Sequence, residues 1–169
     1  MDKKARELLN DQVNKEFYSA SLYLDMSNYY ASANLNGFAN WFKIQAQEEQ
    51  DHALLFLTYL QNNGEDVSLD AIAKPDKEFK EFRDPLVAAL DHERYVTSLI
   101  NGIYDAASSV KDFRTLQFLD WFVKEQGEEE KNTDDLIKRF DLFGSDARGL
   151  YLLDSELASR VYTAPSLVL

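Results

Sequence analysis

Residues 38–59 read FANWFKIQAQEEQDHALLFLTY, and no other stretch constrains the fold more tightly. The residues that could form the buried face of this stretch recur in alternating steps of four and three. This spacing is typical of a helix that buries one stripe of side chains, here called its seam. This seam is apolar at both ends and polar in the middle, where Gln45, Glu49 and His52 follow one another. The spacing predicts a long helix that buries one face and carries a polar interruption at its centre.

Three further stretches repeat this spacing, and each is interrupted by polar residues near its middle. The four seams are Leu9, Val13, Glu16, Ala20, Tyr23, Ser27 and Tyr30; Phe38, Phe42, Gln45, Glu49, His52, Phe56 and Tyr59; Leu86, Leu90, Glu93, Thr97, Ile100, Tyr104 and Ala107; and Leu119, Phe122, Gln126, Glu129, Thr133, Leu136 and Phe140. Four long amphipathic helices predict an all-α bundle.

Turn and capping residues set the boundaries of these helices. Residues 34–37 form a short turn, and Gly64 can supply the left-handed conformation that ends a helix. Asp84 is the expected N-cap of the third helix, with Pro85 at its first position. Residues 64–83 show no helical pattern, so they are expected to be a long connection.

The lengths of the connections predict the topology. A helix of about 28 residues is about 42 Å long, so a short turn makes its neighbour antiparallel, whereas a long connection lets the third helix run parallel to the second. We expect one domain over residues 1–169, with a four-helix bundle over about 3–141 that has one long crossover, and a short fifth helix over about 146–161. The tail from Thr163 onward is expected to be loosely held.

Composition narrows the class of protein. The 169 residues include no cysteine, only six Gly and three Pro, and a formal net charge of −12. The missing cysteines exclude disulfides, thiolate zinc sites and iron–sulfur clusters. The negative charge argues against nucleic-acid binding, which needs clustered Lys and Arg. Without an apolar signal core at the N-terminus or a run of about 18 apolar residues, the sequence predicts a cytoplasmic protein with no membrane segment.

The polar seam residues fall at one depth of the predicted bundle. Glu16 and His52 each lie 18 residues from Asn34 in the first turn, and Glu93 and Glu129 each lie 18 residues from Lys111 in the second. The two hairpins superpose with a constant offset of 77 residues. The residues at this level are Glu16, Glu49, His52, Glu93, Gln126 and Glu129.

Four buried carboxylates need compensation, because burying even one unpaired carboxylate costs many kcal/mol. Two metal ions would neutralise them, and a ligand set of oxygens with one imidazole favours iron or manganese over copper, with zinc less easily excluded. The structural alternative is a wet core with protonated or water-linked carboxylates. His92 lies off the seam, so it is expected to be exposed and not to be a ligand.

At these residues the sequence resembles the ferritins, specifically the bacterial non-haem type. The resemblance covers nearly the whole chain and is most specific in residues 47–52 (QEEQDH), 121–130 (WFVKEQGEEE) and 149–157 (GLYLLDSEL). It implies an iron-storing ferroxidase that oxidises Fe(II) with dioxygen or hydrogen peroxide. It also implies a hollow homo-oligomeric shell of 24 subunits, with the fifth helix at the four-fold contacts, in which the ferric mineral is deposited.

The resemblance also implies the iron ligands. A first iron would be held by Glu16, Glu49 and His52. A second would be held by Glu49, Glu93 and Glu129, with Gln126 nearby. A symmetric di-iron bundle would have a second Glu-x-x-His pair where this chain has Gln126 and Glu129. A third would be held by Glu48, Glu125, Glu128 and Glu129, although Glu48 and Glu125 flank the seam and could equally be solvated charges.

Two further residue assignments follow from the same resemblance. Tyr23, one heptad after Glu16, would border the iron pair and donate an electron; the alternative is a core tyrosine with a satisfied hydroxyl. The haem-binding relatives use a methionine between the Glu and His of the second helix, where this chain has Gln50 and Asp51. No haem is therefore expected.

Two other functions remain open from the sequence. One is a di-iron oxidase or peroxide reductase of the rubrerythrin-like class that stores nothing. The missing cysteines argue against its attached rubredoxin-type centre, and the fifth helix argues for a shell. The other is a storage subunit without catalysis, against which the complete ligand set argues.

Overall fold

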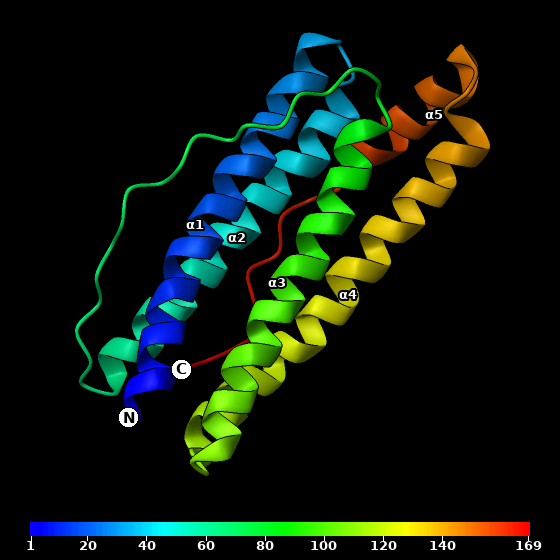
Figure 1. The fold of residues 1–169 in the computed structure, drawn as a ribbon. Coiled ribbons are helices and arrows are strands. Elements are labelled where there is room, and N and C mark those ends of the chain that lie inside the picture. The colour runs from blue at the N-terminus through cyan, green and yellow to red at the C-terminus, as the bar shows by residue number, and fades with distance from the viewer.

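A computed structural model of the chain describes all 169 residues, which form five helices and no strand (Figure 1). The helices are α1 (Lys3–Ser32), α2 (Asn36–Asn62), α3 (Asp84–Ser109), α4 (Phe113–Phe143) and α5 (Ala147–Leu157). The first four form a bundle, and the short α5 lies at one of its ends. The predicted all-α bundle with one long crossover and a short fifth helix is confirmed.

Short turns make α1 and α2, and likewise α3 and α4, antiparallel neighbours. Asn34 and Lys111 in these turns have positive φ angles of 58° and 59°. Gly64 follows the end of α2 with a φ of 72°, so the predicted left-handed helix terminus is present at the predicted residue. This conformation costs a glycine little because it has no Cβ.

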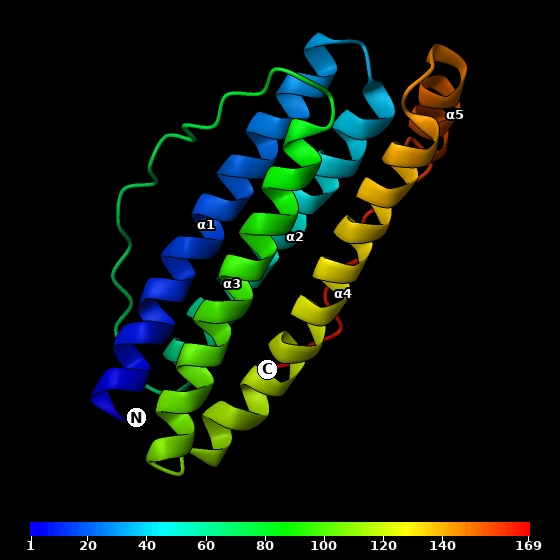
Figure 2. The same cartoon turned by 45° about the vertical axis from the view of Figure 1, so that its right-hand side comes forward.

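The long crossover, residues 63–83, runs along α1 from one end of the bundle to the other (Figures 1 and 2). Two asparagines of α1 fasten it. Asn10 accepts from the Ser68 N–H at 2.7 Å and donates to its carbonyl at 3.1 Å, while Asn14 accepts from the Asp70 N–H at 2.9 Å. The side-chain amides therefore satisfy backbone groups that lie outside any helix or sheet.

The start of α3 differs from the expectation for Asp84. The helix begins at Asp84 itself, and Arg83 occupies the N-cap position. The Asp84 carboxylate accepts instead from the N–H groups of Lys80 and Glu81, at 2.8 and 2.9 Å. It therefore closes the preceding turn of the crossover, and the N-cap prediction is wrong.

The apolar core is divided into two clusters. One cluster, including Phe38, Phe42 and Leu86, lies toward the end that carries α5, and the other, including Phe56, Ile100 and Phe122, lies toward the opposite end. Buried polar residues lie between them along all four helices. None of the helices combines the length and the apolar composition needed to cross a membrane.

The backbone of α5 comes close to the first turn of α2 at Gly37. A Cβ on Gly37 would lie 1.7 Å from the Asp154 carbonyl oxygen, so only glycine allows this approach. The Asp154 carboxylate accepts from the N–H groups of Gly37 and Phe38 at 2.8 and 3.0 Å. Leu35, at the N-cap position of α2, has no side chain that could accept from the free N–H groups of the first turn. The Asp154 carboxylate takes over this capping role.

The C-terminal end differs from the expectation in two ways. The fifth helix ends at Leu157, before the predicted 161. The tail beyond it is held rather than loose: Trp121 donates its indole N–H to Ser166 Oγ at 3.0 Å, and Leu167 packs on the apolar cluster that contains Phe56. Contacts with residues distant in sequence hold this tail, and the hydrophobic spacing within the tail does not predict such contacts.

Candidate metal centre

All four bundle helices contribute to a buried polar layer between the two apolar clusters. Glu16 comes from α1, Glu49 and His52 from α2, Glu93 from α3, and Gln126 and Glu129 from α4. None of these six side chains is more than 5% exposed. The helical spacing places them inside because each occupies a seam position whose neighbours are core residues.

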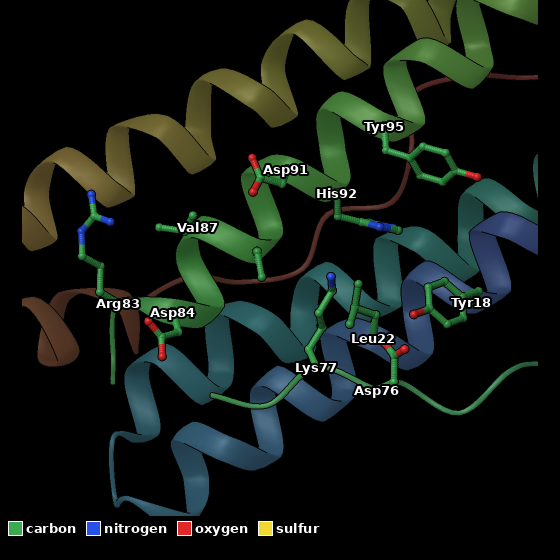
Figure 3. A pocket seen from close by; sticks show the side chains of 11 residues that line it. Tyr18, Leu22, Asp76, Lys77, Arg83, Asp84, Val87, Asp91, His92 and Tyr95 are labelled. Carbon is green, nitrogen blue, oxygen red and sulfur yellow. The ribbon is translucent and has the colours of Figure 1, made fainter. Parts of the chain in front are cut away.

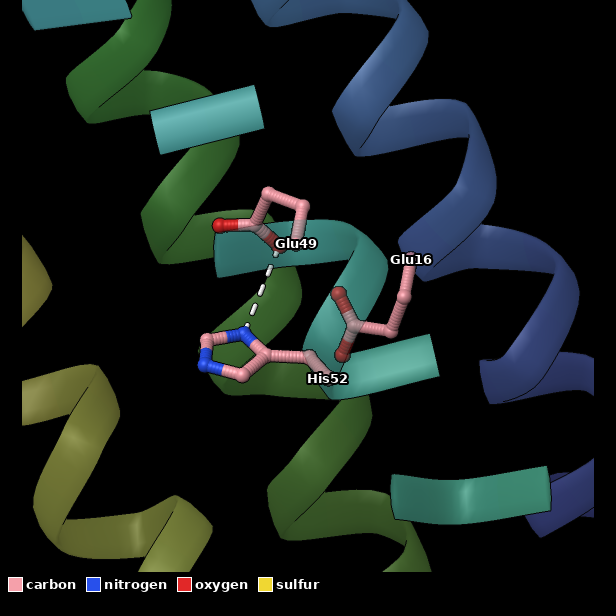
Figure 4. A group of neighbouring side chains, drawn as sticks. All are labelled: Glu16, Glu49 and His52. Atoms are coloured by element: carbon pink, nitrogen blue, oxygen red, sulfur yellow. Dashed lines mark ion pairs between the residues drawn. The ribbon is translucent and has the colours of Figure 1, made fainter. Parts of the chain in front are cut away.

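Three of these residues converge closely (Figure 4). Glu16, Glu49 and His52 each offer a ligand atom, and the three atoms lie within 4.8 Å of one another. The distance from His52 Nδ1 to Glu49 Oε2 is 3.6 Å. Two residues three apart on α2 and one residue of α1 therefore form a compact oxygen–nitrogen ligand set.

The electrostatics of the layer oppose ionisation. Burial, and next the charge of Glu49, raise the pKa of Glu16 well above its ordinary value. Burial, and next the charges of Glu93 and Glu129, do the same to the pKa of Glu49. Burial and the charge of Glu93 raise the pKa of Glu129 to about 8. Without a cation, burial and mutual repulsion therefore favour the protonated form of these carboxyl groups.

One oxygen distinguishes this layer from a polar core in which every buried polar atom has a hydrogen-bond partner. Glu16 Oε2 is buried and accepts no hydrogen bond from a donor group of the protein, whereas buried polar atoms almost always have a partner. Without a cation, the Glu16 carboxyl gains a further partner only by sharing a proton with the Glu49 carboxyl. A cation bound beside Glu49 and His52 would provide that partner and lower the carboxyl pKa values. The donor set of carboxylates and one imidazole fits iron or manganese by ligand type.

Hydrogen bonds hold the carboxylates contributed by α3 and α4. Glu93 accepts from the Tyr23 hydroxyl on one oxygen and from Gln126 Nε2 on the other, at 3.1 Å in the second case. Glu129 accepts from Gln45 Nε2 at 2.5 Å. Burial still raises the pKa of Glu93, although the bonds from Tyr23 and Gln126 act in the opposite direction.

Sequence reasoning assigned no role to two amides that shape the layer. Gln12 donates to Glu16 Oε1 at 2.8 Å, and Gln45 donates to Glu129. Both carried a usable signal: Gln12 lies one helical turn before Glu16, and Gln45 lies on the seam one turn before Glu49. A polar residue at i−4 is a candidate partner of a buried carboxylate on the same helix, which identifies the bond between Gln12 and Glu16. Gln45 bonds Glu129 on another helix, so only its seam position indicated a role.

The residues of the third predicted site are more dispersed. Glu48 is half-buried and pairs with Arg160 at 2.6 Å. Glu125 is half-buried, and burial raises its pKa. Glu128 is exposed and lies 3.6 Å from Lys124. These three residues are not part of the compact ligand group, and Glu48 already has a positively charged partner.

His92 lies outside the layer, beside a pocket of about 550 Å³ between α1, α3 and the crossover (Figure 3). Its side chain is half-buried, so the expectation of an exposed histidine is wrong. Its Nε2 lies 2.8 Å from Ser19 Oγ, and the rings of Tyr18 and Tyr23 pack around it. Burial lowers the pKa of His92 to about 4, so it is neutral at pH 7.

Comparison with known proteins agrees with this architecture. A sequence model of the ferritin-like domain family matches residues 6–143. The chain is 36% identical to a bacterial non-heme ferritin of Campylobacter jejuni over 91% of this chain and 92% of that one. It is 35% identical to a bacterial non-heme ferritin of Staphylococcus haemolyticus over 96% of this chain and 98% of that one.

A solved structure gives the same result at the level of the fold. An open-pore ferritin from the archaeon Archaeoglobus fulgidus superposes with a TM-score of 0.93 and 39% identity, covering 95% of this chain and 98% of that one. The matched family model spans the four bundle helices that contribute the buried polar layer. The chain therefore belongs to the ferritin-like domain family.

Proposed function

We propose that this protein stores iron and is a ferroxidase, with iron as its substrate. It oxidises Fe(II) to Fe(III) at a two-metal centre, and the ferric product is deposited as mineral inside an oligomeric shell. The observation that carries the proposal is the buried group of Glu16, Glu49 and His52, in which Glu16 Oε2 has no partner. Relatives named bacterial non-heme ferritin, about 35% identical along most of the chain, support the same function.

In this proposal Glu16, Glu49 and His52 bind the first iron. Glu49 is shared with the second iron, which also contacts Glu93 and Glu129, with Gln126 beside them. Carboxylate oxygens are hard anionic ligands, and they stabilise the more highly charged Fe(III) more than Fe(II). The ligand set therefore favours electron loss from bound iron. Two Fe(II) ions give two electrons, which with two protons convert dioxygen to hydrogen peroxide.

The surroundings of the centre fit a substrate that must leave. Each oxygen of Glu93 has a hydrogen-bond donor in the protein, so its carboxylate does not depend on iron for a partner. Tyr23, bonded to Glu93, is the proposed electron donor beside the second iron. A third iron site is proposed at Glu48, Glu125, Glu128 and Glu129, which iron would occupy as it leaves the two-metal centre.

Assembly into a shell is the second part of the proposal, because one chain cannot enclose a mineral. Large apolar side chains are exposed near α5: Leu142 is 71% exposed, Tyr151 69% and Leu152 58%. Such a group of exposed apolar residues fits contact with further copies of the chain. We propose 24 copies, acting in the cytoplasm, with either dioxygen or hydrogen peroxide as oxidant.

Aerobic addition of Fe(II) to metal-free protein tests both parts. We expect rapid growth of ferric absorbance and elution from a sizing column as a large shell that retains the iron. Rapid oxidation by a particle of single-chain mass would instead favour the non-storing oxidase. Slow oxidation at the rate of buffer alone would remove the ferroxidase proposal.

The two histidines of the chain provide a matched pair of variants. His52→Ala removes the only imidazole of the compact group and is expected to abolish the fast phase of oxidation. His92→Ala alters a half-buried histidine outside the group and is expected to retain it. Both variants should elute as the parent shell. Equal loss in the two variants would mean that the site is wrongly assigned.

A further inference from the structure

The C-terminal residues 158–169, here called the strap, run back along the bundle from the end of α5. Figures 1 and 2 show this segment passing α2 and α4, and its last residues lie beside the end of α2 and the start of α4. Its contacts follow the chain in order. Asn40 donates to the Arg160 carbonyl at 3.0 Å, the Tyr162 hydroxyl donates to Asp51 at 2.5 Å, and the indole of Trp121 donates to Ser166.

Arg160 makes most of the polar contacts of the strap. Its guanidinium donates to Gln45 Oε1 at 3.0 Å, to Glu48 Oε2 at 2.6 Å and to the Trp41 carbonyl at 3.1 Å. It also lies over the Trp41 ring, with 4.7 Å between the guanidinium carbon and the ring centroid. The Arg160 and Glu48 side chains are only 24% and 18% exposed, so the pair is largely removed from water.

These contacts connect the strap to the metal centre along two routes. Glu48 directly precedes Glu49, the carboxylate shared in the proposed two-metal centre. Gln45 accepts from Arg160 with its oxygen and donates to Glu129 with its nitrogen, so the guanidinium fixes the orientation of the amide that holds Glu129. Arg160 therefore acts on a second-iron ligand through one intermediate side chain.

A guanidinium and a metal ion compete for the same carboxylate. Both are cations, both bind carboxylate oxygens, and a shared site with little water screens their mutual repulsion poorly. Arg160 already neutralises Glu48, the carboxylate of the proposed third site that lies nearest to Glu49 in the chain. A metal ion could use Glu48 only after the guanidinium has moved away.

We infer that Arg160 determines how many metal ions the centre holds: strap docking and metal binding at Glu48 exclude each other. With the strap docked, the centre holds two cations, and a third binds at Glu48 only as Arg160 leaves Glu48 and Gln45. Departure of Arg160 also releases the Gln45 amide that holds Glu129. The inference rests on the proposed metal centre and adds a positioning residue outside the four bundle helices.

Calorimetric titration of metal-free, assembled protein with Zn(II) tests this inference without iron oxidation. The parent is expected to bind one equivalent tightly, a second less tightly and a third only weakly. In Arg160→Gln the third equivalent should bind about tenfold more tightly, the scale of effect known for residues that support metal ligands. Arg160→Lys retains the positive charge and should remain close to the parent.

A double variant shows where the gain arises. Adding Glu48→Gln to Arg160→Gln should return the third equivalent to the weak parental affinity. A gain of at least about threefold in Arg160→Gln that disappears in the double variant supports competition at Glu48. A smaller gain, or a gain that survives loss of the Glu48 charge, overturns it. Failure of the first two equivalents to bind would instead count against the proposed function.

A second measurement keeps Arg160 in place, so it does not depend on the folding of its variants. In a Trp121→Phe background, Trp41 is the only indole, and its emission reports whether Arg160 covers its face. The emission should change as the third equivalent of Zn(II) binds, and this change should be absent when Glu48→Gln is added. A change that is complete after two equivalents, or no change at all, would overturn the inference.

Discussion

The two helical hairpins contribute matched positions to one polar layer but prepare them differently. In the α1–α2 hairpin, Glu16, Glu49 and His52 converge within 4.8 Å, and one Glu16 oxygen is buried without a partner. In the α3–α4 hairpin, both oxygens of Glu93 accept hydrogen bonds, and Glu129 accepts one from Gln45. The offset of 77 residues thus relates the sequence positions of the polar residues in the two hairpins, but their hydrogen-bond environments differ.

This difference shows which half depends on a cation. The α1–α2 half is incomplete without one, because an unpartnered buried oxygen carries a desolvation cost. In the α3–α4 half, donors such as Gln126 and Tyr23 already satisfy the carboxylates, and a metal ion must displace or share those bonds. We therefore expect firm metal binding by the first half and weaker, exchangeable binding by the second.

The largest expected effect is on the stability of the metal-free protein as pH rises. Burial raises the pKa of Glu16, and less so that of Glu93, so the folded state retains protons that the unfolded chain releases. Stability is full below the ordinary pKa of about 4.5 and is lost as pH rises through the folded values. Each retained proton contributes about 1.4 kcal/mol per pH unit.

Thermal melting of the metal-free protein between pH 5 and pH 8 measures this loss. Glu16→Gln should flatten the dependence more than Glu93→Gln, because hydrogen bonds from Tyr23 and Gln126 already favour ionised Glu93. Saturating Zn(II) should restore stability at pH 8. Equal flattening by the two substitutions would mean that the hairpins do not differ in their need for a cation.

Glu49→Gln is expected to have the next largest effect, because Glu49 is the ligand shared by both metal ions. The substitution preserves size and removes the charge. We expect the initial rate of Fe(II) oxidation to fall at least about 100-fold, beyond the 10–100-fold range typical of residues that only support ligands. Stopped-flow absorbance measures the rate. Glu7→Gln, on the exposed face of α1 beside Lys3, should oxidise iron at the parental rate.

The seams made the bundle and the level of its polar layer predictable from sequence. Steps of four and three residues assign the buried face of each helix, and equal distances from the two turns align Glu16 with His52 and Glu93 with Glu129. These are periodic features within single helices and hairpins. They hold in the folded protein because each helix buries the same face along its length, apolar toward both ends and polar in the middle.

Contacts between distant segments were not predictable in the same way. The Asp84 carboxylate binds the turn before it rather than capping its own helix, because the crossover offers N–H groups without other partners. His92 is half-buried because side chains of α1 pack around it. Arg160 lies beyond the last helix, where no periodicity marks an inward position. Such residues are placed by packing between segments, which spacing alone does not encode.

Gln126→Glu should make the second half more like the first. It removes the donor to Glu93 Oε2 and adds a carboxylate where the first hairpin has Glu49. The second equivalent of Zn(II) should bind about tenfold more tightly, in the range by which residues next to ligands alter metal affinity. Titration calorimetry measures it, and Gln117→Glu, exposed on the same helix, controls for the added charge. An unchanged second affinity would show that the amide does not limit binding.

Tyr23→Phe tests the same difference with the smallest change. Its hydroxyl donates to Glu93, so a metal ion approaching that oxygen competes with a hydrogen bond of about 1 kcal/mol net. Removing it should tighten the second Zn(II) equivalent about threefold or somewhat more. Tyr30→Phe is the matched control, because Tyr30 is buried one heptad further along α1 and donates to the Phe82 carbonyl, away from the layer.

The sign of the Tyr23 effect is more informative than its size. Tighter binding in Tyr23→Phe, with no change in Tyr30→Phe, means that the hydroxyl stands in for a cation at Glu93. Weaker binding would mean that the hydroxyl orients Glu93 toward the metal, as second partners of metal ligands commonly do. In that case the α3–α4 half would be as well prepared for a cation as the α1–α2 half. The unpartnered oxygen of Glu16 would then no longer distinguish the two hairpins.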